Sequence, residues 1–385
     1  MDFQLTNEQK ELQKFARDLA KAKFAEKAFT WDEKGEPPFE HAKILAHHGL
    51  LGITVPEEDG GAGGTLFDAL LVMEAVAQIC PHTADMIQVG NFGGIRQLAA
   101  YGSPALKKRI LPTILGGEKM ISAAMSEPDA GSASTDLRTT ARIDGDKVVI
   151  NGSKIFNTNG PFNSYYVVWV RFGNDVRSSG AILVERGAPG FTVGKLERHM
   201  SGEAHCALYF DNCEVPVENI LVREDGFRKL FPVFNIERLG NAIRSLSLAQ
   251  AAFDMAVEHA KVRRQFDRPL CEFQGLQWKF AEMKIKLEAA RLMIYRAAAN
   301  AEKQPPTAMD TAMAKAFANQ SAFEVVNEAL QIFGGYGYST EYPIEYLFRR
   351  IRGWMIAGGT IEILKNKIAE GIFERSFSQR PPKAK

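Results

Sequence analysis

A run of hydroxyl and glycine residues, "AAMSEPDAGSASTDL" at 123–137, contains groups that can hold an anion or a polar ring. Ser126, Gly131 and Ser132 place small hydroxyls and unobstructed backbone N–H groups close together. A polyphosphate or the polar edge of a ring system needs such donors. For any one of these residues alone, ordinary turn formation is the simpler interpretation. The combination of residues favours a binding loop.

A second unusual stretch is "WMIAGGTIEIL", residues 354–364, where two glycines and a threonine interrupt a helical pattern. Glycine enters left-handed backbone angles at low cost, so Gly358 and Gly359 are compatible with a helix cap. Alternatively, bare backbone is required there because a flat ligand comes close. The residues alone leave both interpretations open.

The short signatures of other binding sites are absent. The sequence has no GxGxxG after a strand, no P-loop, no HExxH and no CxxC. Its four cysteines are too scattered for a zinc site or a disulfide framework, so no metal is expected. A net charge of +1 over 385 residues gives no indication of nucleic acid or an anionic membrane. With no signal-peptide pattern and no apolar run long enough to span a bilayer, we expect a cytoplasmic protein.

The chain has three regions that differ in the spacing of their hydrophobic residues, and these regions position the two stretches described above. Residues 1–117 have helical spacing, and Thr6 with Gln9 forms a capping box before the first helix. Residues 118–228 contain short strand-like runs, including a hairpin around "IDGDK", and predict a small antiparallel β domain. Residues 229–385 return to long amphipathic segments typical of a helical bundle. The order indicates an α+β protein.

Five stretches, taken in order, resemble the acyl-CoA dehydrogenase family over nearly the whole chain. They are "AAMSEPDAGSASTDL", "KIFNTNG", "VRRQFDRPLCEFQGLQ", "QIFGGYGYSTEYP" and "WMIAGGTIEIL". The resemblance implies an N-terminal helical domain, a middle β domain and a C-terminal four-helix bundle. It also implies a homotetramer that holds FAD non-covalently between β domain and bundle, at a subunit interface.

The resemblance assigns a set of residues to FAD. Thr158 would reach the flavin edge near N5, and Arg263 would meet the pyrophosphate of the neighbouring subunit's FAD. Phe156 stands where tryptophan is common and keeps an aromatic wall, whereas Glu362 replaces a common glutamine and cannot donate a hydrogen bond. The complete set is Met125, Ser126, Gly131, Ser132, Phe156, Thr158, Arg263, Phe266, Gln274, Gln331, Gly335, Thr360 and Glu362.

Members of this family remove a proton from the carbon next to a thioester carbonyl and pass a hydride from the β carbon to flavin N5. Many of them carry the catalytic glutamate just before the "GT" of the last motif, where this chain has Gly358. The carboxylate is therefore missing, but the peptide N–H of Gly358 remains to polarise the thioester oxygen.

A base is expected on the first long bundle helix, which we expect to begin at "FNIERLGNAIRSLSLAQ". A branch resembling isovaleryl-CoA and long-chain dehydrogenases has its glutamate there, directly before an arginine, and Glu237–Arg238 fits that pattern. The alternative is that Glu237 is a solvated first-turn glutamate. Asp85 is the reserve candidate, although a surface-loop aspartate is the simpler interpretation. Arg238 matches a position near CoA, and Ser132 and Gly359 match positions near the thioester.

The substrate's acyl group is suggested by a second feature of the same helix. Asn241 and Arg244 follow Glu237 by four and seven residues, so they lie on the same face. An arginine facing the acyl pocket would suit a polar, dicarboxylic or aryl-substituted acyl group. Pairing of Arg244 with a neighbouring helix is an equally good interpretation.

The resemblance leads to α,β-dehydrogenation of an acyl-CoA, with electrons passed to an electron-transfer flavoprotein. Three alternatives remain open. The first is an enoyl-CoA reductase working in reverse, similar to crotonobetainyl-CoA reductase. The second is a desulfinase or flavin monooxygenase on the same fold. The third is a flavin-free binding scaffold.

Overall fold

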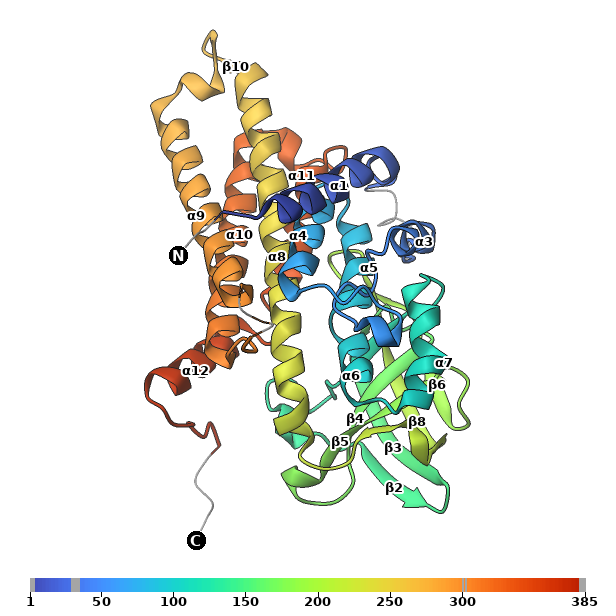
Figure 1. The fold of residues 1–385 in the computed structure, drawn as a ribbon. Helices are drawn as coiled ribbons and strands as arrows, with labels where there is room; N and C mark the ends of the chain where they lie inside the picture. Colours follow the sequence, from blue (N-terminus) through green and yellow to red (C-terminus); the bar gives the residue numbers. More distant parts are fainter. Residues whose placement is uncertain (1–3, 29–34, 300, 302, 381–385) are drawn as a thin grey trace.

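The computed structural model describes residues 4–28, 35–299, 301 and 303–380 (Figure 1). Its N-terminal part is helical, as predicted. The expected capping box is present: Thr6 Oγ1 accepts from the Gln9 backbone N–H, and the Gln9 side chain accepts from the Thr6 N–H. The helices are α1 (Asn7–Lys23), α3 (Phe39–His47), α4 (Leu66–Ala77), α5 (Pro81–Asn91), α6 (Gly94–Tyr101) and α7 (Pro104–Leu115).

The middle region forms a nine-stranded sheet whose main path has the order β6-β8-β3-β2-β4-β5-β9. The hairpin expected at "IDGDK" joins β2 to β3, with Asp144 paired to Lys147. The prediction of antiparallel pairing is incomplete, because β1 runs parallel to β4. The strands are β1 (Ile121–Ala124), β2 (Thr140–Asp144), β3 (Lys147–Thr158), β4 (Tyr165–Arg171), β5 (Ser179–Glu185), β6 (Phe191–Val193), β7 (Glu197–Arg198), β8 (Ala204–Pro216) and β9 (Ile220–Val222).

The C-terminal part is a bundle of long helices, with a small hairpin at one end of it (Figure 1). The hairpin strands are β10 (Arg264–Gln265) and β11 (Arg268–Pro269). None of the described helices is long and apolar enough to cross a membrane. The helices are α8 (Gly226–Val262), α9 (Gln274–Ala298), α10 (Ala308–Phe333), α11 (Pro343–Trp354) and α12 (Ile361–Ile372).

Helix α8 begins earlier than the sequence suggested. It starts at Gly226 instead of near Phe234, and it continues through Pro232. Phe227 and Leu230 are buried and form an apolar face that packs on the sheet, where the Phe227 ring lies 5.5 Å from the ring of Trp169. Burial of this face stabilises about two additional turns of helix. Glu237 therefore lies well inside the helix and not in its first turn.

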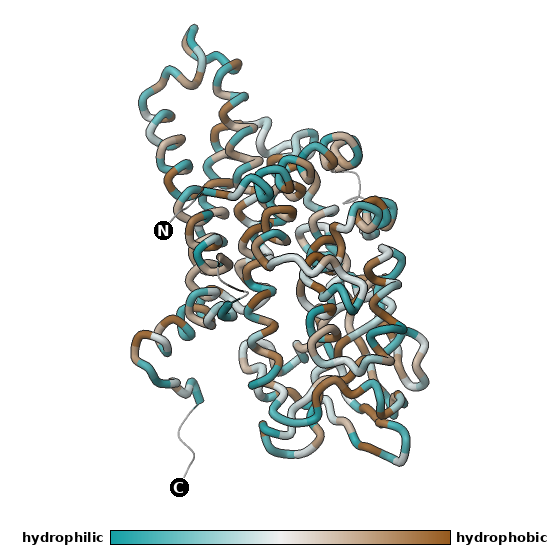
Figure 2. The backbone as a smooth tube through the Cα atoms, in the orientation of Figure 1, coloured by the Kyte–Doolittle hydropathy of each residue, from teal (hydrophilic) through white to brown (hydrophobic). Residues whose placement is uncertain are grey.

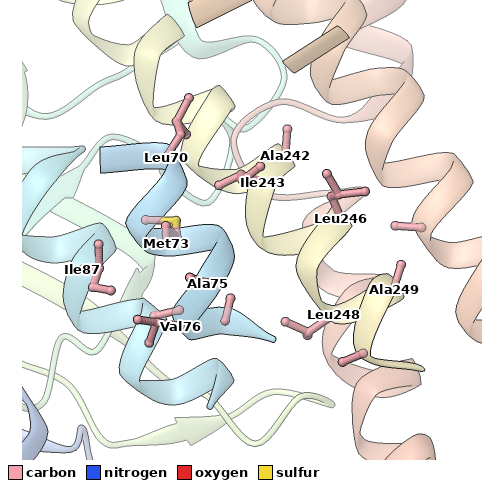
Figure 3. Packing of buried hydrophobic residues seen from close by; sticks show 14 of the residues in the cluster. Leu70, Met73, Ala75, Val76, Ile87, Ala242, Ile243, Leu246, Leu248 and Ala249 are labelled. Atoms are coloured by element: carbon pink, nitrogen blue, oxygen red, sulfur yellow. The ribbon is translucent and has the colours of Figure 1, made fainter. Parts of the chain in front are cut away.

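The largest hydrophobic core joins the N-terminal helices to the bundle. Leu70, Met73 and Val76 of α4 lie between α5 and α8, where Ile243 and Leu246 meet them (Figure 3). The hydropathy-coloured backbone shows the same apolar faces turned inward, with hydrophilic segments at the hairpin tip of the bundle (Figure 2). This packing fixes α5 and α8 against each other, and the candidate site lies along their contact.

Candidate active site

The Glu237 side chain extends from α8 toward the turn at Gly93 that precedes α6. Its Oε2 atom is buried and has no hydrogen-bond partner among the described residues. Gly93 approaches it with φ +63, and a Cβ at that position would lie 3.5 Å from Glu237 Oε2. Only a glycine adopts this angle at low cost while leaving the carboxylate room. Sequence reasoning missed Gly93, although the pair Gly93–Gly94 in "NFGGIR" was a visible signal.

The electrostatic environment makes Glu237 a stronger base than an ordinary glutamate. Burial raises the pKa of its carboxyl group, and the nearby cations Arg244, Arg238 and Lys315 only partly oppose that effect. A raised pKa increases the basicity of the carboxylate, and a missing partner leaves it available for a proton. The alternative of a solvated first-turn glutamate is therefore wrong for Glu237.

The glycine loop between α11 and α12 lies beside this carboxylate. Gly358 and Gly359 have φ values of +71 and +98, so both take backbone angles that L side chains rarely adopt. Arg238 Nε donates to Gly358 O at 3.2 Å, which ties the loop to α8. The N–H of Gly358 donates to no group within the described part of the chain. Thus the loop is fixed through its carbonyls, and one N–H stays available.

Lys315 holds the other side of the loop from α10. Its Nζ donates to Gly359 O at 2.9 Å and to Trp354 O at 3.1 Å. The side chain is fully buried, and burial together with Arg238 lowers its pKa to about 7, against the opposing pull of Glu237. Sequence reasoning missed Lys315. The available signal was a lysine in the alanine-rich stripe "AMAKAFAN", where a buried cation needs a specific partner.

Asp85 lies elsewhere than expected. The interpretation as a surface-loop residue is wrong, because Pro81 begins helix α5 and the Asp85 side chain is only 13% exposed. Arg244 Nη1 donates to its Oδ1 at 2.6 Å, and Arg350 from α11 binds its Oδ2. Burial opposes ionisation, but the two arginines hold the pKa of Asp85 below its usual range. Of the two interpretations of Arg244, the structure contains the ion pair with a neighbouring helix.

The loop after β1 is anchored at its base and exposed at its tip. Buried Lys154 anchors it, since Nζ donates to Met125 O at 3.2 Å and to Glu127 Oε1 at 2.7 Å. Ser126 O accepts from the Ile155 N–H at 2.9 Å. Further along the loop, no heavy atom lies within 4 Å of where a Cβ on Gly131 would stand, and Ser132 is exposed. The loop is thus rigid at its base and presents free groups at its tip.

The end of β3 presents an aromatic ring and a hydroxyl to the outside. Phe156 is 60% exposed, with φ +54. Thr158 Oγ1 lies 3.1 Å from His205 Nε2, and the His205 ring stacks on His199 at 3.5 Å. Burial lowers the pKa of His205. Sequence reasoning did not anticipate this imidazole pair, which two histidines six positions apart do not reveal before the strands are paired.

The remaining residues assigned to FAD occupy other surfaces. Thr360 caps α12 by accepting from the Ile363 N–H at 3.3 Å, and Glu362 is exposed one residue into that helix. The other set lies at the hairpin end of the bundle, where the Phe266 side chain is 88% exposed (Figure 1). That set is Arg263, Phe266, Gln274, Gln331 and Gly335.

The hairpin set is remote from Thr158 within one chain. Along α8, Arg263 follows Glu237 by 26 residues, which at 1.5 Å per residue is about 39 Å. In Figure 1 the hairpin and the sheet lie at opposite ends of the molecule. The hairpin set and the residues around Thr158 can contact one cofactor only if they belong to different subunits.

Comparison with known families matches each region of the chain. Family models of the acyl-CoA dehydrogenase N-terminal, middle and C-terminal domains match residues 6–118, 122–213 and 224–373. The chain belongs to the acyl-CoA dehydrogenase family. It therefore has the acyl-CoA dehydrogenase fold and is a flavin oxidoreductase.

Individual relatives cover nearly the whole chain. It is 36% identical to the 3-sulfinopropanoyl-CoA desulfinase of Paraburkholderia xenovorans, over 98% of this chain and 99% of that protein. It is 37% identical to an acyl-CoA dehydrogenase of Bacillus subtilis, over 93% and 96%. Among solved structures, a glutaryl-coenzyme A dehydrogenase in complex with glutaryl-CoA superposes with a TM-score of 0.94 at 32% identity, covering 99% of this chain and 98% of that one.

The acyl-CoA dehydrogenase cofactor is FAD, and the residues present fit it. A Cβ added to Gly131, Gly334 or Gly335 would meet nothing within 4 Å, so bare backbone faces open space at both sets of contacts. Exposed Phe156 offers a ring face, and Arg263 offers an exposed cation suited to a pyrophosphate. An exposed ring face, an exposed cation and open backbone are groups that a flavin dinucleotide would contact. A surface that binds no ligand would not need them.

Proposed function

We propose that this protein oxidises an acyl-CoA thioester to a 2-enoyl-CoA, with Glu237 as the base, in the manner of the branch resembling isovaleryl-CoA dehydrogenase. One observation carries the proposal. The Glu237 Oε2 atom is buried without a partner among the described residues, and the pKa of the carboxyl group is raised. The adjacent Arg238 binds the loop in which Gly358 replaces the family's usual glutamate.

In this proposal the chain supplies proton removal and charge stabilisation. Glu237 takes the proton from the α carbon. The free N–H of Gly358 donates to the thioester oxygen and stabilises the enolate-like charge. The carbonyl bonds from Arg238 and Lys315 keep that N–H in position. Bound FAD supplies the acceptor for the hydride that leaves the β carbon.

The CoA part and the acyl part of the substrate bind at opposite ends of this site. Arg238 lies near the CoA side, with Ser132 and Gly359 near the thioester. The acyl group extends from Glu237 along α8 toward Asn241 and Arg244. Polar side chains on this path, where an apolar chain would need apolar contacts, support a polar acyl group.

We also propose a homotetramer and an electron-transfer flavoprotein as the electron acceptor. The rise of about 39 Å along α8 from Glu237 to Arg263 supports at least a dimer, in which the hairpin residues of one subunit complete the FAD site of the other. Exposed apolar side chains, including Ile285 at 67% and Trp278 at 62%, support contacts between subunits along the outer bundle face.

The test is Glu237→Gln in the FAD-loaded protein. The amide keeps the shape but cannot accept the proton, so anaerobic bleaching of the flavin by an acyl-CoA should fall by about 10³-fold or more, while the FAD content is unchanged. Glu258→Gln is the matched control, because Glu258 lies on the same helix, is exposed and forms a surface ion pair with Lys261. Full-rate bleaching in the Glu237→Gln protein would remove Glu237 from the mechanism.

Two other activities are candidates on the same fold. The similarity to a 3-sulfinopropanoyl-CoA desulfinase favours the first. Sulfite release that persists in Glu237→Gln would identify it. The second is reduction of an enoyl-CoA, and supplying saturated and unsaturated thioesters to the same protein separates the two directions.

A further inference from the structure

Polar atoms without partners follow one face of α8. Glu237 Oε2 and Arg244 Nε are buried and lack a hydrogen-bond partner within the described chain, and so do both amide atoms of Gln88 on the facing helix α5. Buried polar groups in native proteins almost always have partners, so a cluster of exceptions indicates where a ligand or water completes the site. Three of these four atoms belong to neither the proton transfer nor the thioester.

The packing of α5 on α8 places these atoms in a row. Asp85 meets Arg244, and three residues further along α5 the Gln88 amide meets Gly240. A Cβ on Gly240 would collide with Gln88 Oε1, so glycine is what lets the amide lie against α8. Gly240 is three residues from Glu237, which places Gln88 about 4.5 Å along the helix from the level of the base, and Arg244 about 10 Å along it.

We propose that this row binds an uncharged polar group on the acyl tail, such as a hydroxyl, a carboxamide or a ketone, with Gln88 as the residue that selects it. The inference rests on the proposed function and narrows its substrate class. Gln88 offers both a donor and an acceptor one turn beyond the base. Arg244 Nε offers a second donor to a longer tail.

The charges around the row argue against a carboxylate tail. The Asp85 carboxylate binds both Arg244 and Arg350, and Glu203 Oε1 lies 3.1 Å from Arg350 Nη2, so two anions neutralise two cations. An additional buried anion beside Arg244 would meet cations that are already paired, which is costly. It would also lie near Glu237 and repel the ionised form that takes the proton. A methyl-ended tail, in turn, would leave Gln88 unpaired.

The test measures binding apart from reaction. FAD-loaded Glu237→Gln protein is titrated with four- and six-carbon acyl-CoAs that end in methyl, hydroxyl, carboxamide or carboxylate, and each Kd is determined by calorimetry. We expect the hydroxyl- or carboxamide-ended ligand to bind about tenfold more tightly than the methyl-ended and carboxylate-ended ligands of the same length. Equal or tighter binding of the methyl or carboxylate series overturns the inference.

A substitution at Gln88 sharpens the assignment. Gln88→Met keeps the length of the side chain and removes both polar atoms, so the ratio between hydroxyl- and methyl-ended ligands should fall about tenfold. Gln250→Met, on α8 six residues beyond Arg244, is the matched control and should keep the ratio. An unchanged ratio in Gln88→Met refutes the role of Gln88. The proposed function fails separately, if no thioester bleaches the unmodified protein or if Glu237→Gln bleaches at full rate.

Discussion

Two largely enclosed carboxyl groups on facing helices, Glu237 of α8 and Asp85 of α5, have pKa values shifted in opposite directions. Burial raises the pKa of Glu237, and none of the described residues donates a hydrogen bond to its Oε2. Burial acts on Asp85 in the same sense, but Arg350 and Arg244 each bind one of its oxygens and bring its pKa below the usual range. The comparison indicates that hydrogen-bonded cations, more than depth, set the direction in which burial leaves the pKa of each carboxyl group.

The largest expected difference between the two sites concerns stability. Asp85→Asn removes the anion between two buried guanidinium groups, and we expect it to lower the free energy of unfolding by about 3 kcal/mol. Urea denaturation of the FAD-loaded protein measures this value. The loss should appear without any bound substrate, because Asp85 holds helices together and does not transfer a proton.

Glu237→Gln is the counterpart in the same assay. A folded-state pKa raised above its unfolded value means that the ionised carboxylate destabilises the fold as pH rises through that window. The amide cannot ionise, so stability at pH 7 should be unchanged or increased. A loss as large as that of Asp85→Asn would mean that Glu237 has a structural partner, and the contrast between the sites would be lost.

Lys315 provides a further contrast, because a buried cation at the Glu237 site has a lowered pKa. Its ammonium group interacts with Glu237 and Arg238, and its Nζ binds the glycine loop. With a pKa of about 7, the cation is lost as pH rises through 7, so the flavin bleaching rate of the parent should bend there. Lys315→Met should remove the bend, move the low-pH limb of Glu237 to higher pH, and slow bleaching about tenfold through the looser loop. A stopped-flow pH profile measures all three.

The groups around Lys315 explain why the pH profile separates an electrostatic role of this residue from a structural one. The groups that face the Lys315 amine are Glu237 and Arg238 of α8 and the carbonyls of Trp354 and Gly359. A purely structural lysine would change the rate at every pH by the same factor. A Lys315→Met profile parallel to that of the parent would therefore exclude the electrostatic role.

Sequence patterns predicted the helix–sheet–helix order because hydrophobic period and capping chemistry are local. The Thr6–Gln9 capping box and the hairpin at "IDGDK" are cases in which a few adjacent residues decide the structure. The glycine pair at 358–359 was visible for the same reason, whereas Glu237 was singled out through the resemblance to a branch of the family. The assignment of Glu237 as the base stays a prediction until the substitution is made.

The parts that sequence reasoning missed depend on contacts between distant segments. Asp85 was taken for a surface residue because its partners Arg244 and Arg350 lie 159 and 265 positions away. Lys315 and Gly93 each act through a neighbour on another helix. No local pattern encodes such contacts, since they arise only when the apolar faces of α4, α5 and α8 pack together.

The smallest predicted effect concerns Gly93, whose backbone borders the Glu237 carboxylate. Gly93→Ala places a methyl group 3.5 Å from Glu237 Oε2 at a φ of +63, which costs about 1 kcal/mol of stability and makes the surroundings of the carboxylate more apolar. We expect the low-pH limb of flavin bleaching to move to higher pH.

Gly49→Ala is the matched control, because Gly49 has φ +68 and no described heavy atom within 4 Å of an added Cβ. If both substitutions lower stability equally but only Gly93→Ala moves the limb, the shift comes from the contact with Glu237 and not from backbone strain. If neither moves it, the carboxylate that titrates in catalysis lies elsewhere.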